Sequence, residues 1–107
     1  MIFIMEKEID RKKLELLAAR IRLESIRAMQ ASGGGHVGGC MSIAEVLAVL
    51  YGGIMHYNPE NPKAEPRDKL VLSKGHCGPA LYAALALSGF FPLEELLTLN
   101  KNGTRLP

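Results

Sequence analysis

Apolar and charged residues in the first long segment recur with the period of a helix. The apolar stripe is formed by Leu16, Ala19, Leu23 and Ile26, and it is widened by Leu14, Leu17, Ile21 and Ala28. Asp10 has the side chain of an N-cap. Gly33, Gly34 and Gly35 follow the last turn, and glycine loses more backbone entropy in a helix than any other residue. The pattern therefore predicts a helix from about Asp10 to Ala31.

A second helix is predicted from Ser42 to the glycine pair Gly52-Gly53. Ser42 and Glu45 have the spacing of a capping box. In that motif the hydroxyl and the carboxylate each accept a hydrogen bond from a backbone N–H at the helix start.

The middle of the chain reads as a loop, a strand and a buried helix. Three prolines within residues 56–68 disfavour both a helix and a central strand there. The segment Lys69–Ser73 (KLVLS) then predicts a short strand. Gly78 and Pro79 open a third helix, with Pro at its first position and Gly89 past its end. Its side chains are apolar on nearly every face, so we expect it to be deeply buried.

A fourth helix is predicted from Pro92 to about Leu99, followed by a turn at Asn102-Gly103. Four helices and one strand are an incomplete set, because a lone strand cannot satisfy its backbone groups on either side. We therefore predict an α/β fold in which residues 1–107 are the incomplete, mostly helical N-terminal part of a doubly wound domain, with about one strand.

Charge and composition exclude several classes of function. The net charge is +2, the basic residues form no block, and there are only three Tyr, three Phe and no Trp, which argues against a nucleic-acid surface. The apolar run Met1 to Met5 is too short for a secretion signal, and no apolar run approaches the roughly 20 residues of a membrane span. Two cysteines without a secretion signal indicate reduced thiols and a cytoplasmic location.

Two short segments carry the candidate chemistry, and each places one histidine among glycines before a predicted helix. They are SGGGHVGG with His36 and SKGHCGP with His76. Glycines let the backbone approach a ligand closely, and a helix start favours an anion. The second segment also follows the predicted strand, where open α/β sheets place their ligands. Histidine can donate to a phosphate or carry a proton near neutral pH.

Other readings of these residues remain open. Each glycine-rich segment could be a purely structural turn. His36, Cys40, His76 and Cys77 could ligate a metal, although their spacings are not those of a zinc finger. His56, in MHYNP, has no comparable setting and is expected at the surface or in a turn.

From Leu14 to Pro107 the sequence resembles the N-terminal region of transketolases, and most of all the N-terminal subunit of enzymes split over two chains. The stretches that carry the resemblance are LLAARIRLESIRAM, SGGGHVGG, MSIAEVLAVLY, MHYNPENPK, RDKLVLSKGH, GPALYAALALSGFFP and EELLTLNKNGTRLP. Deoxyxylulose-phosphate synthases share the first glycine–histidine segment but are less similar around LVLSKGHCGPALYAALALSG. Transketolase is therefore preferred.

The resemblance implies a thiamine-diphosphate-binding fold and the transfer of a two-carbon ketol unit between sugar phosphates, with thiamine diphosphate and Mg²⁺ as cofactors. By motif, His36 matches the histidine that contacts the substrate and helps proton movement. His76, with Gly75, matches the contact to the cofactor diphosphate. Val37 stands where the commoner family pattern has Pro, which is a mild departure.

One family signature is missing. The chain has no Gly-Asp-Gly, the segment whose side chains hold the metal against the diphosphate, so no metal ligand is assigned. The family's catalytic glutamate belongs to a C-terminal region or subunit, which the resemblance names as a partner beside sugar phosphates and a further copy of the complete subunit. We expect the isolated chain to be inactive. A non-catalytic interaction module and a functionless remnant are the alternatives.

Overall fold

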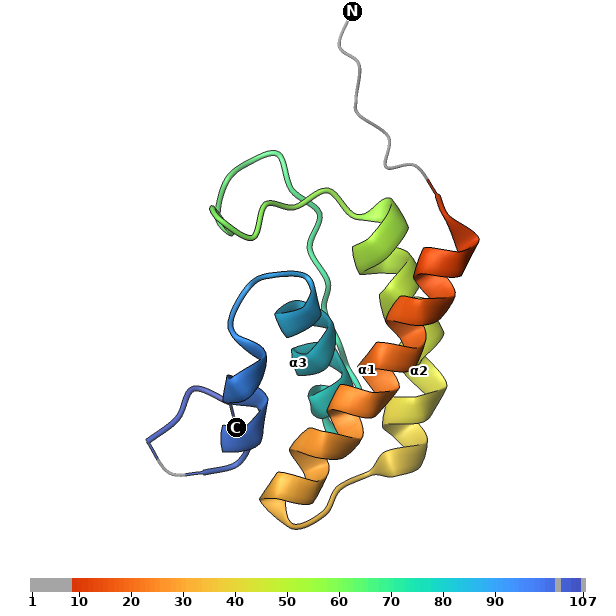
Figure 1. The fold of residues 1–107 in the computed structure, drawn as a ribbon. Helices are drawn as coiled ribbons and strands as arrows, with labels where there is room; N and C mark the ends of the chain where they lie inside the picture. The colour runs from red at the N-terminus through yellow and green to blue at the C-terminus, as the bar shows by residue number, and fades with distance from the viewer. Residues whose placement is uncertain (1–8, 102, 107) are drawn as a thin grey trace, which may run out of the picture.

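The computed structural model describes residues 9–101 and 103–106, and its regular structure there is helical. The elements are the α-helices α1 (Arg11–Ser32), α2 (Val37–Val49) and α3 (Gly78–Leu87), the π-helical turn η1 (Leu50–Ile54), and the 3-10 helices η2 (Gly75–Cys77) and η3 (Leu93–Thr98). In Figure 1, α1 and α2 lie side by side and run in opposite directions, and α3 packs against both. The apolar run Met1 to Met5 lies outside the described residues.

Helix α1 has the ends that its sequence predicts. The Asp10 carboxylate accepts a hydrogen bond from the backbone N–H of Lys13 at 3.2 Å, which satisfies one unpaired donor of the first turn. At the other end Gly33 adopts φ 94°, and its N–H bonds Gln30 O. A left-handed residue here is best supplied by glycine, because a side chain would be strained.

The buried face of α1 differs from the predicted stripe. Ile21 and Ala28, which were expected to widen the stripe, are fully buried. Leu16, Leu23 and Ile26 are instead 62%, 47% and 44% exposed. The helix is apolar on two sides, and the positions of α2, α3 and η3 decide which side is covered.

The predicted start of α2 is wrong. The helix begins at Val37, and the Ser42 hydroxyl donates to Gly39 O at 2.9 Å inside the helix. The Glu45 carboxylate accepts a hydrogen bond from Arg22 of α1 and does not close a capping box with Ser42. Gly38 and Gly39 lower the helix propensity of the first turn, but the complete burial of Cys40 outweighs that cost.

Helices α2 and η1 together form one apolar helix of 18 residues, Val37–Ile54, with mean hydropathy 1.7. By length and composition alone it could cross a membrane. The core helix of a soluble protein has the same properties, so this is a weak indication. In the described part of the chain it is the one helix of this kind. The absence of a membrane partner stays a prediction from the sequence.

The predicted strand Lys69–Ser73 is not formed, and no described residue lies in a β-strand. The segment runs without sheet hydrogen bonds to the start of η2, and Val71 is 87% exposed. A strand needs a neighbour to pair its N–H and C=O groups, and the described residues supply none. The mostly helical character of the prediction is confirmed, whereas its strand is not.

Helix α3 begins and ends as predicted, with Pro79 in its first turn and Gly89 at φ 96° just beyond it. Its alanines fill the core, but its larger side chains are only half-buried, so the expected deep burial holds for one face. The fourth helix is the 3-10 helix η3, with Pro92 as its N-cap. The predicted turn at Asn102-Gly103 lies partly outside the described residues.

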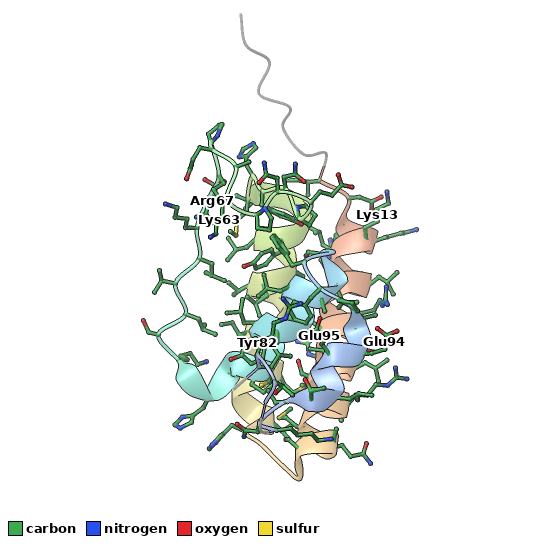
Figure 2. All side chains as sticks on the ribbon, turned by 90° about the vertical axis from the view of Figure 1, so that its left-hand side faces the viewer. Lys13, Lys63, Arg67, Tyr82, Glu94 and Glu95 are labelled. Carbon is green, nitrogen blue, oxygen red and sulfur yellow. The ribbon has the colours of Figure 1, made fainter. Side chains whose placement is uncertain are left out.

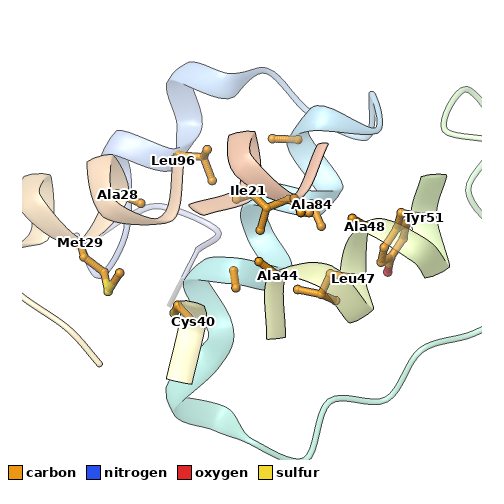
Figure 3. Packing of buried hydrophobic residues seen from close by; sticks show 14 of the residues in the cluster. Ile21, Ala28, Met29, Cys40, Ala44, Leu47, Ala48, Tyr51, Ala84 and Leu96 are labelled. Atoms are coloured by element: carbon orange, nitrogen blue, oxygen red, sulfur yellow. The ribbon is translucent and has the colours of Figure 1, made fainter. Parts of the chain in front are cut away.

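The core lies where α1, α2, α3 and η3 meet. Figure 3 shows Ile21, Leu47, Ala84 and Leu96 converging from these four elements. Small alanines alternate with larger residues, which lets the helices approach closely. This packing fixes the two helix starts on which the histidines sit.

Candidate functional site

The two glycine–histidine segments meet at one end of the molecule. His36 is the N-cap residue of α2, and His76 lies in η2 immediately before α3. Their ring centroids are 4.2 Å apart, with an angle of 36° between the ring planes. Helix packing therefore brings together two side chains that are remote in sequence.

A polar pocket of about 310 Å³ surrounds this pair. Its walls come from both glycine–histidine segments, the first turns of α3 and the end of η3. They include His36, Gly75, His76, Tyr82 and Asn100. Both histidines are exposed to solvent, so a ligand in the pocket can reach their ring nitrogens.

Glycines allow the close approach of the segments that carry the histidines. A side-chain carbon at Gly35 would lie 2.5 Å from Met29 Sδ, and one at Gly39 would lie 3.0 Å from Cys77 Sγ. The absence of a side chain at Gly39 lets the first turn of α2 pack closely against η2. The sequence predicted close approach to a ligand, but at these two positions the neighbour is the protein itself.

The start of α3 is not the open anion site that the sequence suggested. The N–H of Gly78 bonds Gly75 O, and Pro79 has no N–H. The N–H of Ala80 faces the Cys40 sulfur. The first two positions of α3 therefore offer no free backbone donor to a ligand.

Cys40 and Cys77 are free thiols buried behind the pocket. Burial raises the pKa of the Cys40 thiol, and the N–H of Ala80 opposes that shift in part. The Cys40 Sγ lies 4.0 Å from His76 O. Among the described residues, no group of three or more His, Cys, Asp or Glu side chains is arranged to hold a metal ion, so the proposed four-residue metal site is not formed.

His56 lies away from this pocket, at the surface, as expected. Its N–H and its Nδ1 both approach Asp68 Oδ2, at 2.7 and 3.2 Å, and close the proline-rich loop. Tyr82 and Asn100 are pocket residues that the sequence reasoning missed. Tyr82 stands four residues after Gly78, a spacing that places both on one helix face. Asn100, at φ 62°, gave no sequence signal.

A larger pocket of about 400 Å³ lies between α1 and α2. It is a weaker candidate, because its carboxylates Glu15 and Glu45 are already paired with Arg11 and Arg22. No histidine or cysteine lines it. The polar pocket around His36 and His76, called the histidine pocket below, is therefore the candidate site.

Fold and pocket together define the class: a mainly helical structure whose glycine–histidine segments converge on one polar pocket. The chain belongs to the transketolase family. The family described as "Transketolase, thiamine diphosphate binding domain" matches residues 13–107.

Similar proteins of known name support the same family assignment. The chain is 54% identical over 102 residues to the 6-deoxy-6-sulfo-D-fructose transketolase subunit of Clostridium sp. (strain MSTE9), covering 95% of this chain and 36% of the relative. It is 46% identical over 95 residues to a transketolase of Pongo abelii, covering 86% of this chain and 15% of the relative. The chain thus spans about a third of the first relative's length and much less of the second's.

Proposed function

We propose that this chain supplies two glycine–histidine segments of the cofactor site in a thiamine-diphosphate-dependent enzyme that transfers a two-carbon ketol unit between sugar phosphates. The observation that carries the proposal is the 4.2 Å contact between the His36 and His76 rings. Two motifs that were singled out separately in the sequence share one pocket, and the chain belongs to the transketolase family.

The donor set of the pocket fits a phosphorylated ligand. His76 can donate a hydrogen bond to a diphosphate oxygen, and Gly75 beside it leaves space for the group, because no atom lies within 4 Å of where its side chain would stand. His36, on the other segment, can contact the substrate and move a proton. When bound, thiamine diphosphate supplies the nucleophilic carbon that takes up the two-carbon unit.

The described residues do not fit the Mg²⁺ that accompanies this cofactor. Mg²⁺ prefers an octahedron of oxygen ligands, and no cluster of carboxylates stands by the pocket. Ligands for the metal must therefore come from elsewhere in the complete enzyme. We infer that this chain alone does not catalyse ketol transfer.

The rest of the proposal concerns the complete protein. Relatives are several times longer than this chain, which supports a C-terminal region or subunit as partner. There the segment Lys69–Ser73 would pair as one strand of an α/β sheet. A homo-oligomer of the complete subunit and a cytoplasmic location complete the proposal.

A chimera tests the function. Residues 13–107 replace the matching segment of a transketolase, and ketol transfer is assayed with thiamine diphosphate, Mg²⁺, a ketose phosphate and an aldose phosphate. We expect activity in the chimera, loss of most of it with His36→Ala, and no change with the matched surface control His56→Ala. A folded chimera without activity would favour a non-catalytic role.

A further inference from the structure

We propose that Tyr82 is a ligand-binding residue of the histidine pocket, and that its hydroxyl donates a hydrogen bond to the same anionic group that His76 contacts. This rests on the proposed function for the identity of the anion, the diphosphate of the cofactor. The chemistry requires only an anion with several acceptor oxygens.

The position of Tyr82 aims its hydroxyl at the start of α3. Side chains on a helix lean toward its N-terminus, so a residue reaches over the one four positions earlier. A side-chain carbon at Gly78 would lie 3.6 Å from Cε2 of Tyr82 and 3.7 Å from its hydroxyl oxygen. The hydroxyl end of the ring therefore stands over Gly78, in the pocket that His76 also lines. Figure 2 shows Tyr82 on the side of the molecule that also presents Glu95 of η3.

The pocket needs a side-chain donor at this place. The N–H of Gly78 bonds Gly75 O, and Pro79 has no N–H, so the first two positions of α3 offer no free backbone donor. An anion beside His76 therefore finds few free backbone donors at the helix start. A hydroxyl is one of the uncharged side-chain groups that can donate a hydrogen bond there.

The hydroxyl of Tyr82 is available for that bond. The described residues give it no hydrogen-bond partner, although the ring is half-buried and lines the pocket. Tyr57 provides the contrast, because its hydroxyl donates to Tyr51 O at 2.5 Å. The two tyrosines thus differ in whether the protein already uses the donor.

Calorimetric titration of the 107-residue chain with inorganic pyrophosphate and with thiamine diphosphate tests the proposal. Tyr82→Phe keeps the ring and removes the hydroxyl, and we expect it to weaken pyrophosphate binding roughly 10-fold or more. Tyr57→Phe, the same chemical change outside the pocket, should leave the affinity unchanged. As a second measurement, the ring resonances of Tyr82 in the unsubstituted chain should shift during the titration, and those of Tyr57 should not.

The outcomes separate this inference from the proposed function. Equal affinities for the unsubstituted chain and Tyr82→Phe, or no pyrophosphate binding at all, would overturn the inference, while the chimera still tests the function. Tyr82-dependent binding of pyrophosphate without any binding of thiamine diphosphate would support the inference and count against the proposed cofactor.

Discussion

Gly39 on α2 faces Cys77 in η2 so closely that a side-chain carbon at Gly39 would lie 3.0 Å from the Cys77 sulfur. This approach places the first turn of α2, and with it His36, beside His76. We predict that Gly39→Ala destabilises the fold relative to Gly38→Ala by about 1–3 kcal/mol, the usual cost of overpacking.

Gly38 is the matched control, because nothing lies within 4 Å of the position that a side-chain carbon would take there. Gly38→Ala should be neutral or stabilising by up to about 1 kcal/mol, since alanine has the better helix propensity. Denaturant unfolding measures both variants. Adding Cys77→Ala to Gly39→Ala should restore stability if the sulfur is the obstacle, and failure to do so would contradict the steric argument.

The two histidines should have separable effects in the active chimera. His76→Ala should weaken thiamine diphosphate binding by about 1.5–3 kcal/mol, the value of a hydrogen bond to a charged group. His36→Ala should lower turnover more than cofactor affinity. Titration calorimetry and steady-state kinetics distinguish the two, and an unchanged dissociation constant in His76→Ala would refute the role given to it.

The thiols should react slowly with alkylating reagents in the folded chain. Cys40 and Cys77 are buried, and burial raises the pKa of Cys40, so little thiolate is present near neutral pH. Mass spectrometry after iodoacetamide treatment should show little labelling until denaturant is added. Fast labelling under native conditions would show that the packing around η2 opens readily.

Stability should fall on the acid side partly through Glu45. Its hydrogen bond to Arg22 lowers the pKa of this exposed carboxyl. The contribution of this pair to the free energy of unfolding is therefore complete above the unfolded-state pKa of Glu45, roughly 4.3. It is lost as the pH falls through the lower folded-state pKa. The melting temperatures of the unsubstituted chain and Glu45→Gln, measured from pH 7 to 3, should converge at low pH. Glu60→Gln is the exposed control, and a difference that persists at pH 3 would exclude this ion pair as its cause.

The isolated chain should self-associate as its concentration rises. Leu16, Leu23 and Ile26 form an apolar stripe on the outer face of α1, and the segment 69–73 leaves backbone groups unpaired. Sedimentation and melting at several concentrations measure this. Leu16→Gln with Leu23→Gln should reduce association more than Leu97→Gln on η3. A monomer with a sharp, concentration-independent transition would contradict the prediction.

Local chemistry determined several features without tertiary information. Asp10 caps α1 and Gly33 ends it, because each satisfies or relieves the backbone at its own position. Pro79 starts α3 for the same local reason. The family also followed from the sequence, since its motifs are contiguous and were matched over residues 13–107.

Tertiary structure decided what depends on neighbours. The Ser42–Glu45 spacing predicted a helix start, but packing of Cys40 extends α2 back to Val37. Residues 69–73 have strand composition and form no strand, because pairing requires a second strand. The two histidines could be singled out along the chain, but only the close approach of α2 and η2 sets their rings 4.2 Å apart and places Tyr82 in the same pocket.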